Sequence, residues 1–197
     1  MKIVIASANH QKVWEFRSLL SLFPNWDIQW LSHFPQLKLP EEKGTTFLEN
    51  AEAKALAIAK ELSCYALGDD SGLIVPALSG EPGIFSKRYA GNEASDSDNR
   101  NKLLDKMAGM EGDARYAYFE CSLAIAGPQG IIKSVTANCE GYILEQPKGN
   151  LGFGYDALFV KHDYDKSFAE ISESVKNRIS HRSKAFERLV PILHTLN

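Results

Sequence analysis

Leu67-Gly68-Asp69-Asp70-Ser71-Gly72-Leu73-Ile74-Val75 sets two adjacent carboxylates between two apolar runs, the first of which begins at Cys64. Two acids side by side at the end of a strand repel each other, and a divalent cation relieves that repulsion. Hard oxygen ligands suit Mg²⁺, and a site with one or two carboxylates leaves room for substrate phosphates. Gly72 lets the backbone turn sharply beside such an ion. The alternative is an Asp-rich turn between two strands, which this stretch alone favours equally.

The overall composition is that of one globular domain. A chain of 197 residues is long enough to bury a sizeable core. The formal net charge of −3 argues against a general nucleic-acid or anionic-membrane binder, because those proteins carry a broad basic excess. An anionic ligand therefore has to be held by a local basic cluster.

The cysteines and the N-terminus predict an intracellular protein. Cys64, Cys121 and Cys139 are widely spaced, odd in number and set in apolar runs, which is typical of buried thiols in a reducing cytoplasm. The chain begins directly with an apolar strand pattern, and no apolar span approaches the roughly 20 residues of a membrane helix. We expect a soluble cytoplasmic protein with no membrane or nucleic-acid partner.

The N-terminal segment predicts an anion site. A buried strand over residues 1–8 runs into Ser7-Ala8-Asn9-His10-Gln11-Lys12 and then into a helical pattern with Val13, Phe16 and Leu20 on one face. Unpaired N–H groups and the helix dipole at such a helix start favour phosphate, and Lys12 adds a full charge. The alternative is an ordinary connection with a solvated lysine. The glycines and the Gly-Lys-Ser/Thr ending of a P-loop are missing.

Capping signals mark two further helices. The spacing of Thr46 and Glu49 predicts the start of an alanine-rich helix that runs through about Leu62. Glu41 and Glu42 precede this helix, where an acid more commonly supports the dipole than reaches a metal. Later in the chain we expect a helix capped at residues 95–98 and an antiparallel hairpin of residues 114–126 and 131–143.

Lys148-Gly149-Asn150-Leu151-Gly152-Phe153-Gly154-Tyr155-Asp156 is the second informative stretch. Three glycines free the backbone, while two aromatic rings and an acid are displayed on it. That combination suits stacking on a planar ring and reading its edge. The alternative is a glycine-rich hairpin turn without a ligand.

The last segment, from about Ser172, is helical and basic. In one unbroken helix Lys176 and Arg182 lie six residues apart and face different sides, because each residue turns about 100°. If both serve one ligand, the helix breaks near Ser180, which can cap the second piece. The alternative is a solvated basic face.

Taken together, the motifs resemble those of the inosine triphosphate pyrophosphatase-like family, the XTP/dITP diphosphatases that remove noncanonical purine nucleoside triphosphates. Residues 7–12 match the family's Thr-Gly-Asn-x-x-Lys element, and residues 69–73 with 82–91 match its most characteristic block. Residues 44–51, 152–156 and 180–182 complete the series in the right order along nearly the whole chain.

The resemblance implies an α/β fold with two lobes, a mixed sheet flanked by helices and an active-site cleft between the lobes. It implies one domain over residues 1–197, which is usually a homodimer. The implied reaction is the Mg²⁺-dependent hydrolysis of XTP, ITP and dITP between the α and β phosphates.

The resemblance also implies roles for individual residues. Ser7, Ala8, Asn9, His10, Gln11 and Lys12 hold phosphates, Asp70 is the metal-linked general base, and Ser71 contacts the substrate. Phe153, Gly154, Tyr155, Asp156, Lys176, His181 and Arg182 line the nucleotide pocket. Glu41 matches a position linked to metal binding in some members.

Each step of the implied reaction can be matched to one or more of these residues. A triphosphate brings about four negative charges, which Mg²⁺ with Lys12, Lys176 and Arg182 can neutralise before water attacks. Asp70 then deprotonates the water, although a carboxylate with an ordinary pKa of roughly 4 is a weak base. His181 and Arg182 are the candidate donors to the 6-oxo group of the purine, and Phe153 is the candidate stacking ring.

Four positions depart from the family pattern: Ala8 replaces a glycine, Ala157 replaces a common proline, and Ser174 and Val175 stand where acids are frequent. None of them removes a group that the reaction needs. Two alternatives stay open, a diphosphatase of other base specificity and a nucleotide-binding protein without activity.

Overall fold

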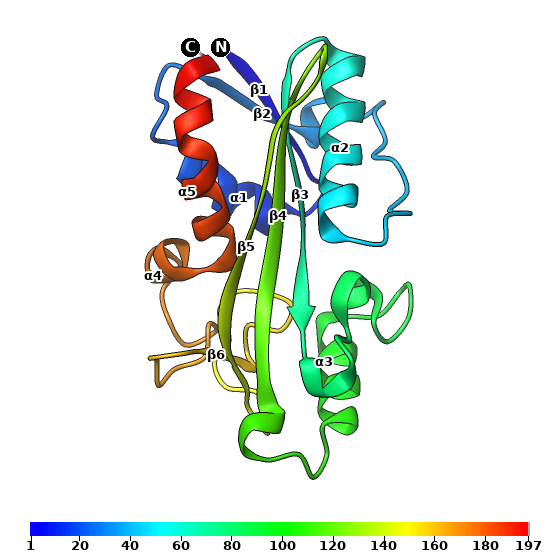
Figure 1. Ribbon diagram of the computed structural model, residues 1–197, viewed down its shortest axis with the longest axis vertical. Helices are drawn as coiled ribbons and strands as arrows, with labels where there is room; N and C mark the ends of the chain where they lie inside the picture. The colour runs from blue at the N-terminus through cyan, green and yellow to red at the C-terminus, as the bar shows by residue number, and fades with distance from the viewer. Residues whose placement is uncertain (197) are drawn as a thin grey trace. The chain divides into compact units, whose positions relative to one another are not determined.

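A computed structural model of the protein describes residues 1–196. The strands are β1 (Lys2–Ala6), β2 (Asp27–Trp30), β3 (Tyr65–Ile74), β4 (Tyr116–Gly127), β5 (Gly130–Ile143) and β6 (Phe159–Lys161). The α-helices are α1 (His10–Leu20), α2 (Phe47–Leu62), α3 (Asp96–Lys106), α4 (Glu173–Ile179) and α5 (His181–Leu193) (Figure 1).

The strands form one six-stranded sheet in the order β2-β1-β3-β4-β5-β6. β1 pairs in parallel with both β2 and β3, whereas β5 and β6 are antiparallel. The predicted α/β class with a mixed sheet flanked by helices is therefore confirmed, and so is the hairpin, which turns at residues 128–129 between β4 and β5.

The chain divides into two compact units. Unit 1 comprises residues 1–70, 121–137 and 182–197, and unit 2 comprises residues 71–120 and 138–181. Each unit has an apolar core made of its own residues. The single two-lobed domain over residues 1–197 stays a prediction.

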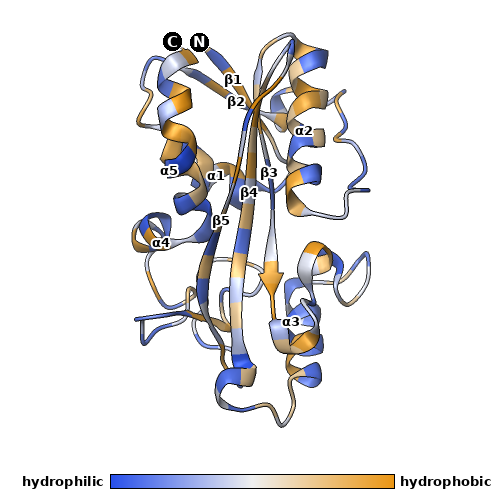
Figure 2. Cartoon of the chain, viewed as in Figure 1, coloured by the Kyte–Doolittle hydropathy of each residue, from blue (hydrophilic) through white to orange (hydrophobic). Residues whose placement is uncertain are grey.

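In unit 1, helices cover both faces of the parallel strands. The chain runs β1-α1-β2-α2-β3, with α1 and α5 on one face and α2 on the other (Figure 1). Side chains alternate along β1 accordingly, since Ile3 and Ile5 belong to the core on the α1 side and Val4 and Ala6 to the core that includes the α2 alanines. The helices show the banding of apolar and polar residues expected of elements with one buried face (Figure 2).

Side-chain caps start α1 and α2, and the cap of α2 is the one that the sequence predicts. The Asn9 side chain accepts hydrogen bonds from the backbone N–H groups of Gln11 and Lys12, at 2.9 and 3.2 Å. The Thr46 hydroxyl accepts one from the N–H of Glu49 at 3.2 Å, which confirms the predicted cap. Helix α2 lies so close to β3 that a Cβ on Gly68 would be 2.1 Å from the Ala51 carbonyl oxygen. Glycine on the strand and alanines on the helix permit this close approach.

Unit 2 has an aromatic core. The Phe119 and Phe159 rings meet edge to face with centroids 4.8 Å apart, and Phe168 joins Phe159 at 5.0 Å. Ser95 and Asp98 form a reciprocal capping box at the start of α3, as predicted. Among residues 1–196, none of the helices has both the length and the apolar character needed to span a bilayer.

Two further predictions concern the ends of elements. α4 ends at Ile179 and α5 begins at His181, so the predicted break at Ser180 is confirmed, and Ser180 has an extended backbone. The prediction that Asp69 and Asp70 stand at a strand end is wrong, because β3 continues without interruption to Ile74.

Candidate active site

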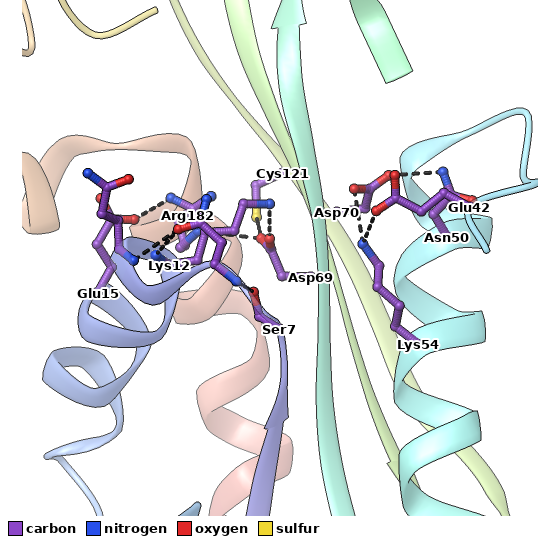
Figure 3. A network of polar contacts seen from close by, with 12 residues as sticks. Ser7, Lys12, Glu15, Glu42, Asn50, Lys54, Asp69, Asp70, Cys121 and Arg182 are labelled. Atoms are coloured by element: carbon purple, nitrogen blue, oxygen red, sulfur yellow. Dashed lines mark hydrogen bonds and ion pairs between the residues drawn. The ribbon is translucent and has the colours of Figure 1, made fainter. Parts of the chain in front are cut away.

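Asp69 and Asp70 project from opposite faces of β3 (Figure 3). Consecutive side chains of a strand alternate between its faces, so two neighbouring acids within a strand cannot act as one pair. Asp69 points toward α1 and α5, and Asp70 points toward α2 (Figure 3). The predicted pair relieved by a shared cation is therefore corrected to two separate carboxylates with different partners.

On its face, Asp69 accepts from three donors. The Lys12 ammonium forms an ion pair with Oδ2, and the Cys121 thiol lies 3.3 Å from Oδ1. Nε of Arg182 lies 3.4 Å from the same Oδ1, and Nη1 of Arg182 forms an ion pair with Glu15. Lys12 and Glu15 are one turn apart on α1, so this helix supplies both a cation and an anion to the network.

Buried charge controls protonation on this face. Burial alone would raise the pKa of Asp69, but the charges of Lys12 and Arg182 outweigh it and hold that pKa well below its usual range. Burial likewise opposes the charge of Arg182, and Glu15 and Asp69 outweigh it and raise the pKa of the guanidinium. Burial and Asp69 raise the pKa of the Cys121 thiol, which therefore stays protonated and donates to Asp69.

On the opposite face, α2 supplies the partners of Asp70. Nδ2 of Asn50 donates to Oδ2 at 3.0 Å, and Nζ of Lys54, one turn later, lies 3.1 Å from Oδ1. Lys54 also pairs with Glu42 at 2.9 Å, so one ammonium joins two carboxylates. Burial raises the pKa of Asp70, and the charges of Lys54 and Lys12 offset only part of that effect.

This network lies where an α/β sheet commonly binds ligands. In the order β2-β1-β3, the connection through α1 runs from β1 to β2, and the connection through α2 runs from β2 past β1 to β3 over the opposite face. The carboxyl end of β1, whose pairing with β3 stops at Gly68 just before Asp69 and Asp70, thus lies at a topological switch point, where ligands bind in open α/β sheets. Ser7 follows β1 at this point, and its hydroxyl accepts from the Asn9 N–H at 3.2 Å.

The predicted phosphate loop, residues 7–12, is partly open. Ala8, His10 and Gln11 are exposed, Ser7 is buried, and the Lys12 side chain is 15% exposed. Ala8 does not have a positive φ, so the alanine that replaces the family's glycine causes no backbone strain. A hollow of about 410 Å³ borders Ser7, Ala8 and His10 on one side, but its other walls are mostly apolar and do not suit a polyanion.

The glycine-rich stretch in unit 2 is built around a buried acid. Oδ2 of Asp156 accepts from the Phe153 N–H at 2.9 Å and from Nζ of Lys176 at 2.5 Å. The same Nζ lies 4.6 Å from the centre of the Phe153 ring. Gly152 has a φ of +71°, and a Cβ there would lie 2.1 Å from the Asp156 carboxylate, so only glycine fits.

Two residues of this stretch are not displayed as predicted. Tyr155 is 4% exposed, packs in the core of unit 2 and donates its hydroxyl to the Ser86 carbonyl at 3.0 Å. Asp156 is 3% exposed. The expected display of two aromatics and an acid is therefore corrected: Phe153 is half-buried, whereas Tyr155 and Asp156 hold the loop from inside.

The remaining predicted residues differ in their burial and in their partners. His181 is buried in unit 2 and stacks on Phe119, with centroids 4.7 Å apart and planes 14° apart. Arg182 is buried in unit 1, where it pairs with Glu15 and Asp69. Ser71 is half-buried. The Glu41 side chain is 81% exposed and pairs with Lys43 at 3.0 Å, so Glu42 is the acid that joins the network of Asp70.

Sequence reasoning missed Glu15, Asn50 and Lys54. In each case a signal was present, because a polar residue stands at a core position of an amphipathic helix. Asn50 and Lys54 fall at helical spacing between the buried Phe47 and Ile58 of α2, and Glu15 lies one turn before Leu19, which packs against the core. A buried polar group needs a partner, so such positions predict polar contacts.

Comparison with known proteins shows the family of this chain. A model of the Ham1 family matches residues 3–192. The chain belongs to the Ham1 family. The resemblance described from the motifs is thereby confirmed.

Individual Ham1 relatives match along their full length. The chain is 53% identical over 197 residues to a protein of Protochlamydia amoebophila named dITP/XTP pyrophosphatase, covering 100% of this chain and 99% of the relative. A Chlamydia caviae protein of the same name is 48% identical and is covered to 96%. The solved Ham1 protein of Staphylococcus aureus superposes with a TM-score of 0.88 at 39% identity, with both chains covered completely.

Proposed function

We propose that this Ham1-family chain hydrolyses noncanonical purine nucleoside triphosphates, XTP, ITP and dITP among them, between the α and β phosphates. One water is consumed, and the products are the nucleoside monophosphate and pyrophosphate. The chain is accordingly an enzyme, a nucleoside triphosphate diphosphatase, as the names of its full-length relatives indicate. The carrying observation is the buried Asp70, whose pKa is raised, beside a lysine at the switch point of the sheet.

Asp70 is the proposed general base. It takes a proton from the attacking water on its carboxylate, and its raised pKa makes it a stronger base than a carboxylate of ordinary pKa. Asn50 and Lys54 each bind one of its oxygens, which fixes the plane of the carboxylate. This revises the expectation that Asp70 has an ordinary pKa and that metal coordination of the water must therefore carry much of the activation.

Lys12 and Lys54 are the proposed partners of the phosphates. Both ammonium groups belong to unit 1, and Lys12 stands in the first turn of α1, whose N–H groups also favour an anion. Arg182 pairs with Asp69, and Asp69 pairs in turn with Lys12, so we assign Arg182 a positioning role.

The residues around Asp70 fit Mg²⁺. In the part of the chain that the structure describes, there is no group of three or more His, Cys, Asp or Glu side chains that could hold a metal. Mg²⁺ commonly uses only one or two protein carboxylates, and Asp70 and Glu42 converge on one cationic atom, Nζ of Lys54. We propose these two as its ligands in place of Asp70 with Glu41. Bound there, Mg²⁺ would neutralise phosphate charge and lower the pKa of a bound water.

We assign recognition of the purine to unit 2. The half-buried Phe153 ring offers a face for stacking, and Asp156 holds the Lys176 ammonium beside that ring. Lys176, which also pairs with Asp156, and His181 are the proposed donors to the 6-oxo group, because both belong to unit 2 with Phe153, whereas Arg182 belongs to unit 1. A donor aimed at an oxo group discriminates against adenine, which presents an amino group there.

The decisive experiment compares turnover of XTP, ITP, dITP, GTP, ATP and dUTP with and without Mg²⁺, measured as pyrophosphate release. The proposal expects Mg²⁺-dependent release from XTP, ITP and dITP and little from ATP. Preferred cleavage of dUTP would instead indicate a diphosphatase of other base specificity. Tight binding of nucleotides without release would indicate a protein that only binds them.

Two expectations from the sequence stay predictions: a homodimer, which the resemblance implies, and a cytoplasmic location, which the cysteines and the N-terminal pattern indicate. Light scattering on the purified protein measures the mass of the assembly, and a value near that of one chain would contradict the dimer. Fractionation of cells tests the location. A small-molecule substrate is the only partner that the proposed chemistry requires.

A further inference from the structure

Helix α3 holds the glycine-rich loop from outside. Oδ2 of Asp96 accepts from the Gly154 N–H at 2.6 Å, and Nη1 of Arg100 donates to the Gly154 carbonyl oxygen at 2.7 Å. Both backbone polar groups of one residue are thus bound by two oppositely charged side chains. All of these residues belong to unit 2.

The spacing of the two side chains explains the arrangement. Asp96 and Arg100 are four residues apart and so lie on the same face of α3, one turn from each other. Asp96 is the first residue of the helix, and the capping box of Ser95 and Asp98 fixes the helix start. The acceptor and the donor are therefore presented from a rigid element, and each bond is strengthened by a full charge.

Gly154 directly follows Phe153, so the two bonds that restrain the Gly154 backbone also restrain Phe153. Its φ is +58°, and no atom lies within 4 Å of where a Cβ would stand, so the side-chain side is open and the backbone alone is anchored. On the inner side, the loop is fixed by the Asp156 bond to the Phe153 N–H and by the Tyr155 hydroxyl on Ser86. Asp96 and Arg100 bind the backbone of Gly154, which lies between Phe153 and Tyr155 in the chain.

We propose that Asp96 and Arg100 are positioning residues that set the Phe153 ring for purine recognition and so determine base selectivity. The inference rests on the proposed function, because it needs Phe153 to stack on the base. Loosening the loop weakens binding of the purine and leaves proton transfer at Asp70 untouched, since Asp70 belongs to unit 1. The effect falls on KM and on discrimination between bases, not on kcat.

The test compares Asp96→Ala, Arg100→Ala and the double variant with the wild type. The matched control is Asp105→Ala, which removes an exposed acid from the same helix. Each single variant should raise KM for XTP about tenfold, the worth of one charge-assisted hydrogen bond, and keep kcat within about twofold. The double variant should be little worse than either single one, because both side chains hold the backbone of the same residue, Gly154. Arg100→Lys should recover part of the loss.

Two binding measurements separate this role from general damage. Calorimetric titration with inosine monophosphate should show the same roughly tenfold weakening in both single variants. Titration with inorganic pyrophosphate should show no change, because that ligand lacks a base. Unchanged KM and unchanged affinity for inosine monophosphate would overturn the inference, as would an equal loss of affinity for both ligands.

Failure of the proposed function looks different. If the wild type releases no pyrophosphate from any triphosphate, the hydrolase proposal fails, and the titrations with inosine monophosphate still decide the role of Asp96 and Arg100. If an alanine variant does not fold, Asp96→Asn and Arg100→Lys provide the same comparison with smaller changes.

Discussion

The two faces of β3 shift the pKa of an aspartate in opposite directions. Asp69 and Asp70 are both buried, yet the pKa of Asp69 is lowered and that of Asp70 is raised. On the Asp69 face, Lys12 and Arg182 both contact the carboxylate, and their charges more than offset the cost of burial. On the Asp70 face, Lys54 is the one cation in hydrogen-bonding contact among the described residues, and Glu42 shares it.

This difference separates a structural acid from a chemical one. Asp69, whose pKa is lowered, is ionised at neutral pH and holds Lys12 and Arg182. Asp70 is poised to exchange a proton, which is what a general base must do. Substitutions on the two faces should therefore change different measured quantities.

The largest effect should come from Asp70→Asn, which keeps the size of the side chain and removes the base. We expect kcat to fall on the order of a thousandfold, within the range typical of losing a general base. Pyrophosphate release in a steady-state assay measures it, and a thermal melt close to that of the wild type excludes unfolding. Turnover within about tenfold of the wild type would remove Asp70 from the mechanism.

Asp69→Asn should instead act on stability. The substitution leaves Lys12 and half of the Arg182 contacts without their buried anion, and breaking a buried ion pair costs about 3 to 5 kcal/mol. Urea unfolding of both variants checks the contrast: the free energy of unfolding should fall by about 3 kcal/mol in Asp69→Asn and by less than 1 kcal/mol in Asp70→Asn. Equal losses would mean that the two faces do not differ as described.

Acid should act on the two carboxylates with opposite sign. The folded pKa of Asp69 lies below its unfolded value of about 4, so its stabilisation is complete above that value and is lost as the pH falls through the folded pKa. The folded pKa of Asp70 is raised, so protonation of this group favours the folded state.

Urea unfolding of the metal-free protein between pH 7 and pH 3 tests both signs. The stability advantage of the wild type over Asp69→Asn should shrink as the pH falls. The stability of the wild type relative to Asp70→Asn should rise over the same range. Parallel curves for the three proteins would contradict the two shifts.

The smallest effect should come from Cys121→Ser. A hydroxyl can still donate to Asp69, so we expect kcat within about twofold and a stability change below about 1 kcal/mol. Cys121→Val removes the donor and keeps a buried apolar side chain, and it should cost somewhat more. If Ser and Val behave alike, the thiol contributes packing and not a hydrogen bond.

Local features of this protein could be read from the sequence because neighbouring residues determine them. Thr46 and Ser95, the predicted caps, each accept a hydrogen bond from an N–H group three residues away. The break at Ser180 followed from asking Lys176 and Arg182 to act together. The tertiary arrangement uses that break differently, since Lys176 pairs with Asp156 and Arg182 pairs with Glu15 and Asp69.

The sequence by itself determined the strand and helix order, the family and the residue types that the chemistry needs. Only the tertiary structure decided which face each acid occupies and what it meets there. Two adjacent aspartates look alike along the chain, but whether they lie in a strand or a turn depends on long-range pairing, here of β3 with β1. Their pKa values depend on charges brought from α1, α2 and α5, far away in sequence, and no local pattern reports that balance.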